Sequence, residues 1–151
     1  MRVGPVSLED RQVRDLLEAH QRGMHEASPP GTSFALDLTG LSSPDISIFG
    51  AWDGDTLLAV GALKQLSADQ AEIKSMRTHP DHLRRGAAQA VLDHILEVAR
   101  SRSLRRISLE TGTNETFVPA VELYAKRGFK PGEGFAGYEN GPHNQCYHLA
   151  L

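Results

Sequence analysis

The feature that most constrains the fold of this chain is a strand that leads through a short basic loop into a long amphipathic helix. Residues 71–77 are predicted to form the strand, and Arg84-Arg85-Gly86 stands in the loop. The helix is predicted from residue 85 to about residue 101, because apolar side chains recur there at helical spacing. These side chains are Ala88, Val91, Leu92, Ile95, Leu96 and Ala99. A helix with one apolar face has to cover another layer, so the unit predicts a domain in which helices pack on a sheet.

The N-terminal part predicts one strand and one helix. A short strand near Val3 precedes a helix that Ser7 is expected to cap and that runs to about Gly23. The apolar stripe of this helix consists of Val13, Leu16, Leu17 and His20. Residues 28–33 combine Pro, Gly and Ser and predict a loop.

The other strands follow from short apolar runs and turn signals. Residues 46–52 and 56–66 predict a hairpin, and Gly61 marks a place for a bulge or a bend. Residues 107–111 predict a later strand, and residues 146–151 predict a closing one. A further helix is expected to carry Phe117, Ala120, Val121 and Tyr124 on one face, with Pro119 in its first turn and Gly128 as its cap. This order of elements predicts a mixed α/β or α+β domain.

Composition narrows the class of protein. The 151 residues predict a single domain over residues 1–151, and a net charge of −3 argues against a nucleic-acid partner. The longest apolar run, residues 57–63, is too short to cross a bilayer, and no apolar signal-peptide core follows Met1. Cys146 is the only cysteine, which fits a reducing compartment. We therefore expect a cytoplasmic protein with no membrane partner.

The basic loop has the chemistry of an anion cradle. The first N–H groups of a helix lack internal partners and lie at the positive end of its dipole. The small residues Gly86, Ala87 and Ala88 allow a phosphate to approach the backbone, and Arg84 and Arg85 add positive charge. The chain contains neither GxxxxGK[ST] nor GxGxxG. Taken alone, an Arg-Arg-Gly tripeptide also fits a helix start with two solvated arginines.

Two motifs in this order resemble the GNAT acetyltransferase superfamily. The first is His79-Pro80 followed by Leu83-Arg84-Arg85-Gly86-Ala87-Ala88, and the second is Leu123-Tyr124-Ala125-Lys126-Arg127-Gly128-Phe129. The resemblance covers essentially the whole chain. It implies a single GNAT-like domain with a central, mostly antiparallel mixed sheet, a parallel pair of strands that splay apart, and about four flanking helices.

The resemblance also implies acetyl-CoA as the acyl donor, with no metal. Met76 and Thr78 are expected to offer main-chain contacts to pantetheine, and a backbone N–H near Arg77 to stabilise the oxyanion. The pyrophosphate is expected on the loop, whose residues are Leu83, Arg84, Arg85, Gly86, Ala87 and Ala88. Leu83 replaces the Gln or Arg that begins the family's loop motif. Phe117 stands where the family often has Asn, and Asn114 is expected to supply that contact to the cofactor.

By the same resemblance Tyr124 is the catalytic candidate, protonating the departing thiolate. A phenol with a pKa of about 10 can donate to a thiolate whose conjugate acid has a pKa of about 8.5. Tyr124 also shares an apolar face, as a core aromatic would. Glu72 is expected to be the base that deprotonates the amine, with Glu110 as the second candidate. Each of the two also fits a simpler interpretation, a charged side chain on the exposed face of a strand.

The acceptor is expected to be a small-molecule primary amine. His25, Glu26, Ser28, Glu110 and Tyr138 are its candidate contacts. His79 and His82 lack a third ligand, so zinc is not expected. Three alternatives stay open: a catalytically silent CoA-binding sensor or partner module, an acetyltransferase of protein or peptide amines, and a nucleic-acid or nucleotide-binding domain that uses the Arg84-Arg85 loop. Homodimer formation through edge strands also stays open.

Overall fold

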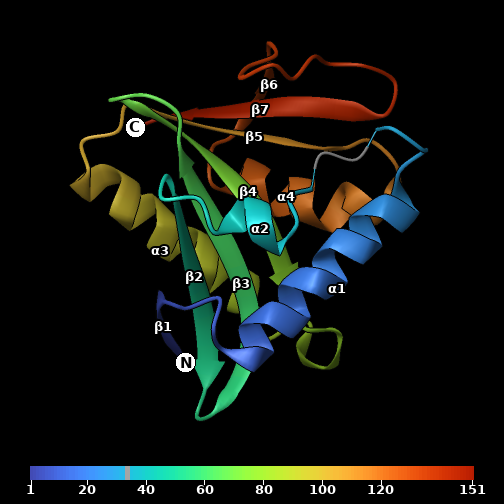
Figure 1. Cartoon of the computed structure of the whole chain (residues 1–151). Helices are drawn as coiled ribbons and strands as arrows, with labels where there is room; N and C mark the ends of the chain where they lie inside the picture. The colour runs from blue at the N-terminus through green and yellow to red at the C-terminus, as the bar shows by residue number, and fades with distance from the viewer. Residues whose placement is uncertain (33–34) are drawn as a thin grey trace.

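The computed structural model describes residues 1–32 and 35–151, which form one seven-stranded sheet with helices on both faces (Figure 1). The strands are β1 (Arg2–Pro5), β2 (Ile46–Asp53), β3 (Thr56–Gln65), β4 (Gln70–Thr78), β5 (Arg106–Gly112), β6 (Lys130–Gly132) and β7 (Asn144–Ala150). The helices are α1 (Arg11–Ala27), α2 (Leu38–Leu41), α3 (Ala87–Ser101) and α4 (Val118–Lys126), with single 3₁₀ turns η1 (Pro80–His82) and η2 (Glu115–Phe117). Ser33, the last residue of the predicted loop, lies outside the described residues.

The sheet has the order β1-β2-β3-β4-β5-β7-β6. All neighbouring strands run antiparallel except β4 and β5, which are parallel. The expected fold class, a mixed and mostly antiparallel sheet with one parallel pair and four helices, is therefore confirmed.

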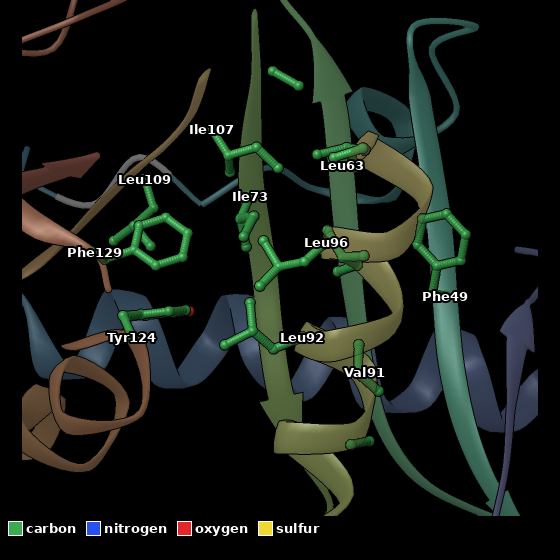
Figure 2. Packing of buried hydrophobic residues seen from close by; sticks show 14 of the residues in the cluster. Phe49, Leu63, Ile73, Val91, Leu92, Leu96, Ile107, Leu109, Tyr124 and Phe129 are labelled. Atoms are coloured by element: carbon green, nitrogen blue, oxygen red, sulfur yellow. The ribbon is translucent and has the colours of Figure 1, made fainter. Parts of the chain in front are cut away.

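Two apolar cores hold the layers together. On one face α3 and α4 pack against the sheet, and Figure 2 shows Leu92, Leu96, Ile73, Ile107 and Phe129 interleaved there. On the other face α1 and α2 cover a second cluster that includes the fully buried Val13 of the predicted stripe. Burial at roughly 25 cal/mol per Å² of apolar surface makes these two clusters the main source of stability.

Helix α1 differs from its predicted bounds at both ends. Asp10 rather than Ser7 is the cap, because its carboxylate accepts the Val13 N–H, while Ser7 accepts only the N–H of Glu9. The helix also continues past Gly23 to Ala27. A helical glycine costs about 1 kcal/mol relative to alanine, and the packing of α1 on the sheet outweighs that cost. Helix α3 similarly begins at Ala87 rather than at residue 85.

The bulge predicted near Gly61 is present, and its extra residue lies on β4. Ala62 pairs with Lys74 and Val60 with Arg77, so Ser75 and Met76 stand opposite the single Gly61. Ser75 has a φ of 56°, in the left-handed region. A Cβ at Gly61 would lie 2.4 Å from the Met76 sulfur, which explains why a residue without a side chain stands there.

Strand β6 was not predicted. Its sequence, Lys-Pro-Gly, has low strand propensity, and it becomes a strand only because β7 pairs with it from Lys130↔His148 to Gly132↔Cys146. The predicted closing strand, residues 146–151, also began too late in the chain, because β7 already begins at Asn144.

Candidate active site

The parallel strands β4 and β5 separate in the middle of the sheet. They pair only from Gln70↔Arg106 to Glu72↔Ser108, although β4 continues to Thr78 and β5 to Gly112. The splayed pair expected from the family resemblance is therefore confirmed. The strand edges beyond Glu72 and Ser108 face an opening rather than each other.

The far end of β4 directs backbone groups toward this opening. The His79 N–H donates to the Leu58 carbonyl of β3 at 2.8 Å. Because N–H groups alternate between the two sides of a regular strand, that of Thr78 points away from β3. Thr78 is one of the two positions expected to pair with pantetheine; the other, Met76, lies in the bulge, and both contacts stay predictions.

A groove of about 350 Å³ lies between the end of β4, the start of α3 and helix α4. Five of the predicted cofactor residues line it: Met76, Arg77, Thr78, Leu83 and Ala88. The opposite wall comes from α4 and includes Pro119, Leu123 and Tyr124. Leu83 is 58% exposed and gives the groove mouth an apolar side chain where the family's loop motif has Gln or Arg.

The loop before α3 is shaped to receive an anion. Arg84 and Gly86 have φ values of 62° and 79°, and a Cβ at Gly86 would meet no atom within 4 Å. Among the described residues no side chain caps α3 or α4, whereas Asp10 and Asp37 cap α1 and α2. The first N–H groups of α3 are thus not used by a capping side chain, and the phosphates of a CoA molecule fit such a loop.

The two arginines of the loop are not equivalent. Arg85 forms an ion pair with Asp53 of β2 at 2.7 Å, which lowers the pKa of that carboxyl, and it contacts the His82 ring at 3.2 Å. Arg84 is exposed and makes no ion pair with any residue in the described ranges. Arg84 is therefore the side chain of the pair that is available to a phosphate.

A second, inner pocket of about 90 Å³ lies on the other side of the opening, between β4, β5 and α1. It shares Met76, Ala120 and Tyr124 with the groove. Polar and charged side chains also line it, and these are His20, Glu72, Lys74, Ser75, Glu110 and Thr111. The two spaces meet at Tyr124, and the charged side chains Glu72, Lys74 and Glu110 line only the inner pocket.

Tyr124 is buried, at 6% exposure, and Figure 2 shows its ring projecting from α4 toward the sheet. Phe129 holds the ring edge-on, with 5.7 Å between the ring centroids. Burial raises the pKa of Tyr124, so the phenol keeps its proton at neutral pH. Its hydroxyl forms no hydrogen bond with a described residue, and it is therefore free to donate to a ligand.

The two candidate bases stand in different surroundings. Glu72 is buried and forms an ion pair with the buried Lys74 at 3.0 Å. Glu110 forms no ion pair or hydrogen bond with a described residue, and burial raises its pKa to about 7 despite the nearby charge of Lys74. A base works best with a pKa near the working pH and a free lone pair. The structure therefore favours Glu110 over Glu72, the reverse of the order given by the family layout.

Tyr138 reaches this polar cluster from the loop between β6 and β7. The Lys74 ammonium donates to its hydroxyl at 2.7 Å and lies 5.3 Å from its ring centroid. The structure thus brings together Glu72, Glu110, Tyr124 and Tyr138 from four separate segments. Phe117 is buried and lines the inner pocket beside them.

Other predicted contacts lie elsewhere. His25 and Glu26 are exposed in the last turn of α1, because the helix continues past Gly23, and Ser28 follows at its end. None of the three lines the groove or the inner pocket. The Asn114 amide donates to the Ala27 carbonyl at 2.6 Å and accepts the Thr116 N–H, so its side chain is used within the protein. The ligand contacts expected of these four residues stay predictions.

His20 lines the inner pocket, although the sequence pattern indicated only a place in an apolar stripe. The side chain is 8% exposed, and its Nδ1 has no hydrogen-bond partner in residues 1–32 and 35–151. Burial, Arg77 and Lys74 lower the His20 pKa to about 4, so the ring is neutral at physiological pH. A polar residue inside an otherwise apolar stripe was the available signal.

Within the described ranges, no three His, Cys, Asp or Glu side chains lie together in a way that would hold a metal ion. The same ranges contain no helix with the length and apolar character needed to span a membrane.

Comparison with known proteins places this site in a family. The acetyltransferase (GNAT) family model matches residues 11–129. The chain is 45% identical to the uncharacterized N-acetyltransferase YedL of Escherichia coli over 139 residues, which cover 92% of this chain and 87% of that one. It is 46% identical to the uncharacterized N-acetyltransferase YsnE of Bacillus subtilis over 137 residues, or 91% of each chain.

Solved structures share the fold at lower identity. A Klebsiella pneumoniae protein assigned as an acyl-CoA N-acyltransferase superposes with a TM-score of 0.81 at 20% identity, covering 99% of this chain and 97% of that one. A Bacillus subtilis acetyltransferase in complex with CoA superposes with a TM-score of 0.71 at 20% identity, covering 99% and 98%. The matched family model, the two N-acetyltransferase relatives and the splayed strands agree: the chain belongs to the GNAT family of N-acetyltransferases.

Proposed function

We propose that this enzyme transfers an acetyl group from acetyl-CoA directly to the primary amine of a small molecule. The observation that carries the proposal is the meeting of two spaces at Tyr124, a groove ending in an uncapped helix start and an inner pocket with a free carboxyl. A solved relative in fold binds CoA, which supports the donor. The small volume of the inner pocket, about 90 Å³, supports a small acceptor.

Acetyl-CoA, when bound, supplies the thioester carbonyl that the amine attacks. Glu110 takes the proton of the acceptor ammonium, since its pKa of about 7 leaves it partly ionised at neutral pH. Tyr124 donates a hydrogen bond to the departing sulfur. The burial that keeps its phenol protonated also makes full proton transfer costlier, so hydrogen-bond donation is the role that this environment favours. No covalent enzyme intermediate is needed, and the buried Cys146, whose thiol pKa is raised by burial, has no part in the transfer.

The test is turnover of acetyl-CoA with a panel of primary amines, followed as free thiol and as acetylated product by mass spectrometry. We expect product with at least one small amine at a rate well above hydrolysis. Binding of acetyl-CoA without turnover on any amine would instead support the silent CoA-binding module. Turnover on peptide amines alone would support the peptide acetyltransferase. A cytoplasmic location belongs to the same proposal and is supported by the single, buried cysteine.

A further inference from the structure

Three charged side chains of β4 lie on the face of the sheet that α1 covers. Glu72 and Lys74 line the inner pocket together with His20 of α1. Arg77 reaches the same helix one turn later, because a Cβ at Gly23 would lie 2.9 Å from its Nη1. Residues three apart on a helix share a face, so His20 and Gly23 present one surface to this row of charges.

Two of the charged groups on this face have no partner among the described residues. Glu72 and Lys74 neutralise each other at 3.0 Å, with side chains 3% and 8% exposed. The Arg77 guanidinium makes no ion pair or hydrogen bond with any described residue, and neither does the Glu110 carboxyl. A guanidinium and a carboxyl that are both half-buried are costly to leave unpaired, so the arrangement is complementary to a ligand that carries both a cation and an anion.

The surroundings of Arg77 favour an anion rather than another protein group. His20 is the titratable side chain of α1 beside it, and that ring is neutral because burial, Arg77 and Lys74 all oppose its protonation. Gly23 leaves the space that the guanidinium occupies. The planar guanidinium binds a carboxylate through two parallel hydrogen bonds, which makes it the usual residue for that task.

We propose that the acceptor is a small zwitterion of the amino-acid type, with its amine at Glu110 and its carboxylate bound by Arg77. The inference rests on the proposed function and adds the class of substrate. Arg77 lines the groove, and its guanidinium lies against Gly23 of α1 near His20, which lines the inner pocket, so the proposal places this side chain between the two spaces.

The test compares matched acceptors that differ in one group. Each amino acid of a panel is assayed beside its amide, its decarboxylated amine and an aminoalkyl phosphate of similar length. We expect kcat/KM for the preferred amino acid to exceed that of its amide and amine on the order of tenfold to a hundredfold, the usual contribution of a charge-assisted hydrogen bond. Equal values for acid and amide would overturn the proposal, as would a preference for the phosphate.

Two variants locate the effect in the structure. Arg77→Gln is expected to abolish the preference for the acid over the amide. Gly23→Ala is expected to weaken the preference by displacing the guanidinium, without lowering Tm, because alanine is the better helix former. Arg22→Gln, which removes an exposed guanidinium from the neighbouring position of α1, is the matched control. A rise in the KM for acetyl-CoA alone in Arg77→Gln would assign Arg77 to the donor and refute the proposal.

A binding measurement separates this inference from the proposed function. The Tm of the CoA-saturated protein is measured with the preferred amino acid and with its amide. We expect a larger rise with the acid, and loss of that difference in Arg77→Gln. If no amine of any kind is acetylated, the proposed function fails. If amines are acetylated without regard to the carboxylate, only the zwitterion assignment fails.

Discussion

Glu72 of β4 and Ser108 of β5 are the last two residues that pair across the parallel strands. Beyond them the strands diverge, and the inner pocket opens between residues 72–76 of one strand and residues 109–111 of the other. The groove reaches this opening from the α3 and α4 side of the sheet, and the inner pocket reaches it from the α1 side. In the proposed reaction this one interrupted ladder determines where the two substrates meet.

Tyr124→Phe is predicted to lower kcat by one to several orders of magnitude with little change in acetyl-CoA affinity. The substitution removes only the hydroxyl that is free to donate to the departing sulfur, and it keeps the ring that packs on Phe129. Steady-state kinetics and calorimetric titration with acetyl-CoA measure the two quantities. Tyr147→Phe, which loses a hydroxyl bonded to Gln145 on β7, is the control and should retain activity. Unchanged kcat in Tyr124→Phe would remove the residue from the mechanism.

Glu110→Gln is predicted to become more stable than the wild type as the pH rises. The folded-state pKa is raised from 4.5 to about 7, so the folded protein binds this proton more tightly than the unfolded chain does. The contribution of the protonated carboxyl is complete below pH 4.5 and is lost as the pH passes through about 7. Urea unfolding at pH 5 and pH 8 should show the gap between variant and wild type widening at the higher pH.

The same variant tests the role of Glu110 as the base. In the wild type the logarithm of kcat/KM should bend near pH 7, where the carboxyl titrates, and Glu110→Gln should lose that bend together with most of its activity. Glu122→Gln, at an exposed carboxylate of α4, is the control. A bend that persists in Glu110→Gln would return the role to Glu72 or to water.

Gly86→Glu is predicted to abolish acetyl-CoA binding by placing bulk and negative charge where the phosphates are expected. Gly31→Glu is the matched control, because Gly31 also has a left-handed φ, 82°, and open space around its Cβ position. Both substitutions introduce the same backbone strain of roughly 1–2 kcal/mol, so a difference in acetyl-CoA affinity between them measures the contribution of the loop before α3. Equal acetyl-CoA affinity in the two variants would mean that the loop is not the phosphate site.

Gly61→Ala is predicted to destabilise the fold by about 1–3 kcal/mol, the usual cost of overpacking a core. The added Cβ would press on the Met76 sulfur at 2.4 Å and on Val91 Cγ1 at 2.9 Å. Chemical denaturation measures the change, and Gly4→Ala on β1, with no atom within 4 Å of the new Cβ, serves as control. Wild-type stability in Gly61→Ala would show that the bulge on β4 tolerates a side chain at this position.

Much of the fold was predictable because the signals are local. The helical spacing of Val91, Leu92, Ile95 and Leu96 is enough to predict α3 from that stretch of sequence alone. The turn signal Asp53-Gly54-Asp55 likewise predicts the hairpin that joins β2 to β3. Strand β6 was not predictable, because three residues of low strand propensity pair only after β7 is in place. The end of α1 was also missed, since Gly23 remains helical through contacts that lie far away in the sequence.

The site likewise contains residues that local motifs predict and residues that depend on contacts between distant segments. Tyr124 and Gly86 stand in contiguous motifs, and their places could be anticipated. The order of the two bases could not, because it depends on Lys74 forming its ion pair with Glu72 and leaving Glu110 unpaired. His20 was hidden because periodicity reports only that a side chain faces inward, and not that it meets a polar pocket.

The most direct test of the account is the Tm of the purified protein with and without excess acetyl-CoA. Binding to the native state alone at a hundredfold excess over Kd adds about 2.7 kcal/mol, which corresponds to roughly 5–10 °C for a domain of this size. We predict such a rise with acetyl-CoA and none with a plain adenine nucleotide at the same concentration. No shift at millimolar acetyl-CoA would contradict the account, since the groove between β4 and α4 would then not be a donor site.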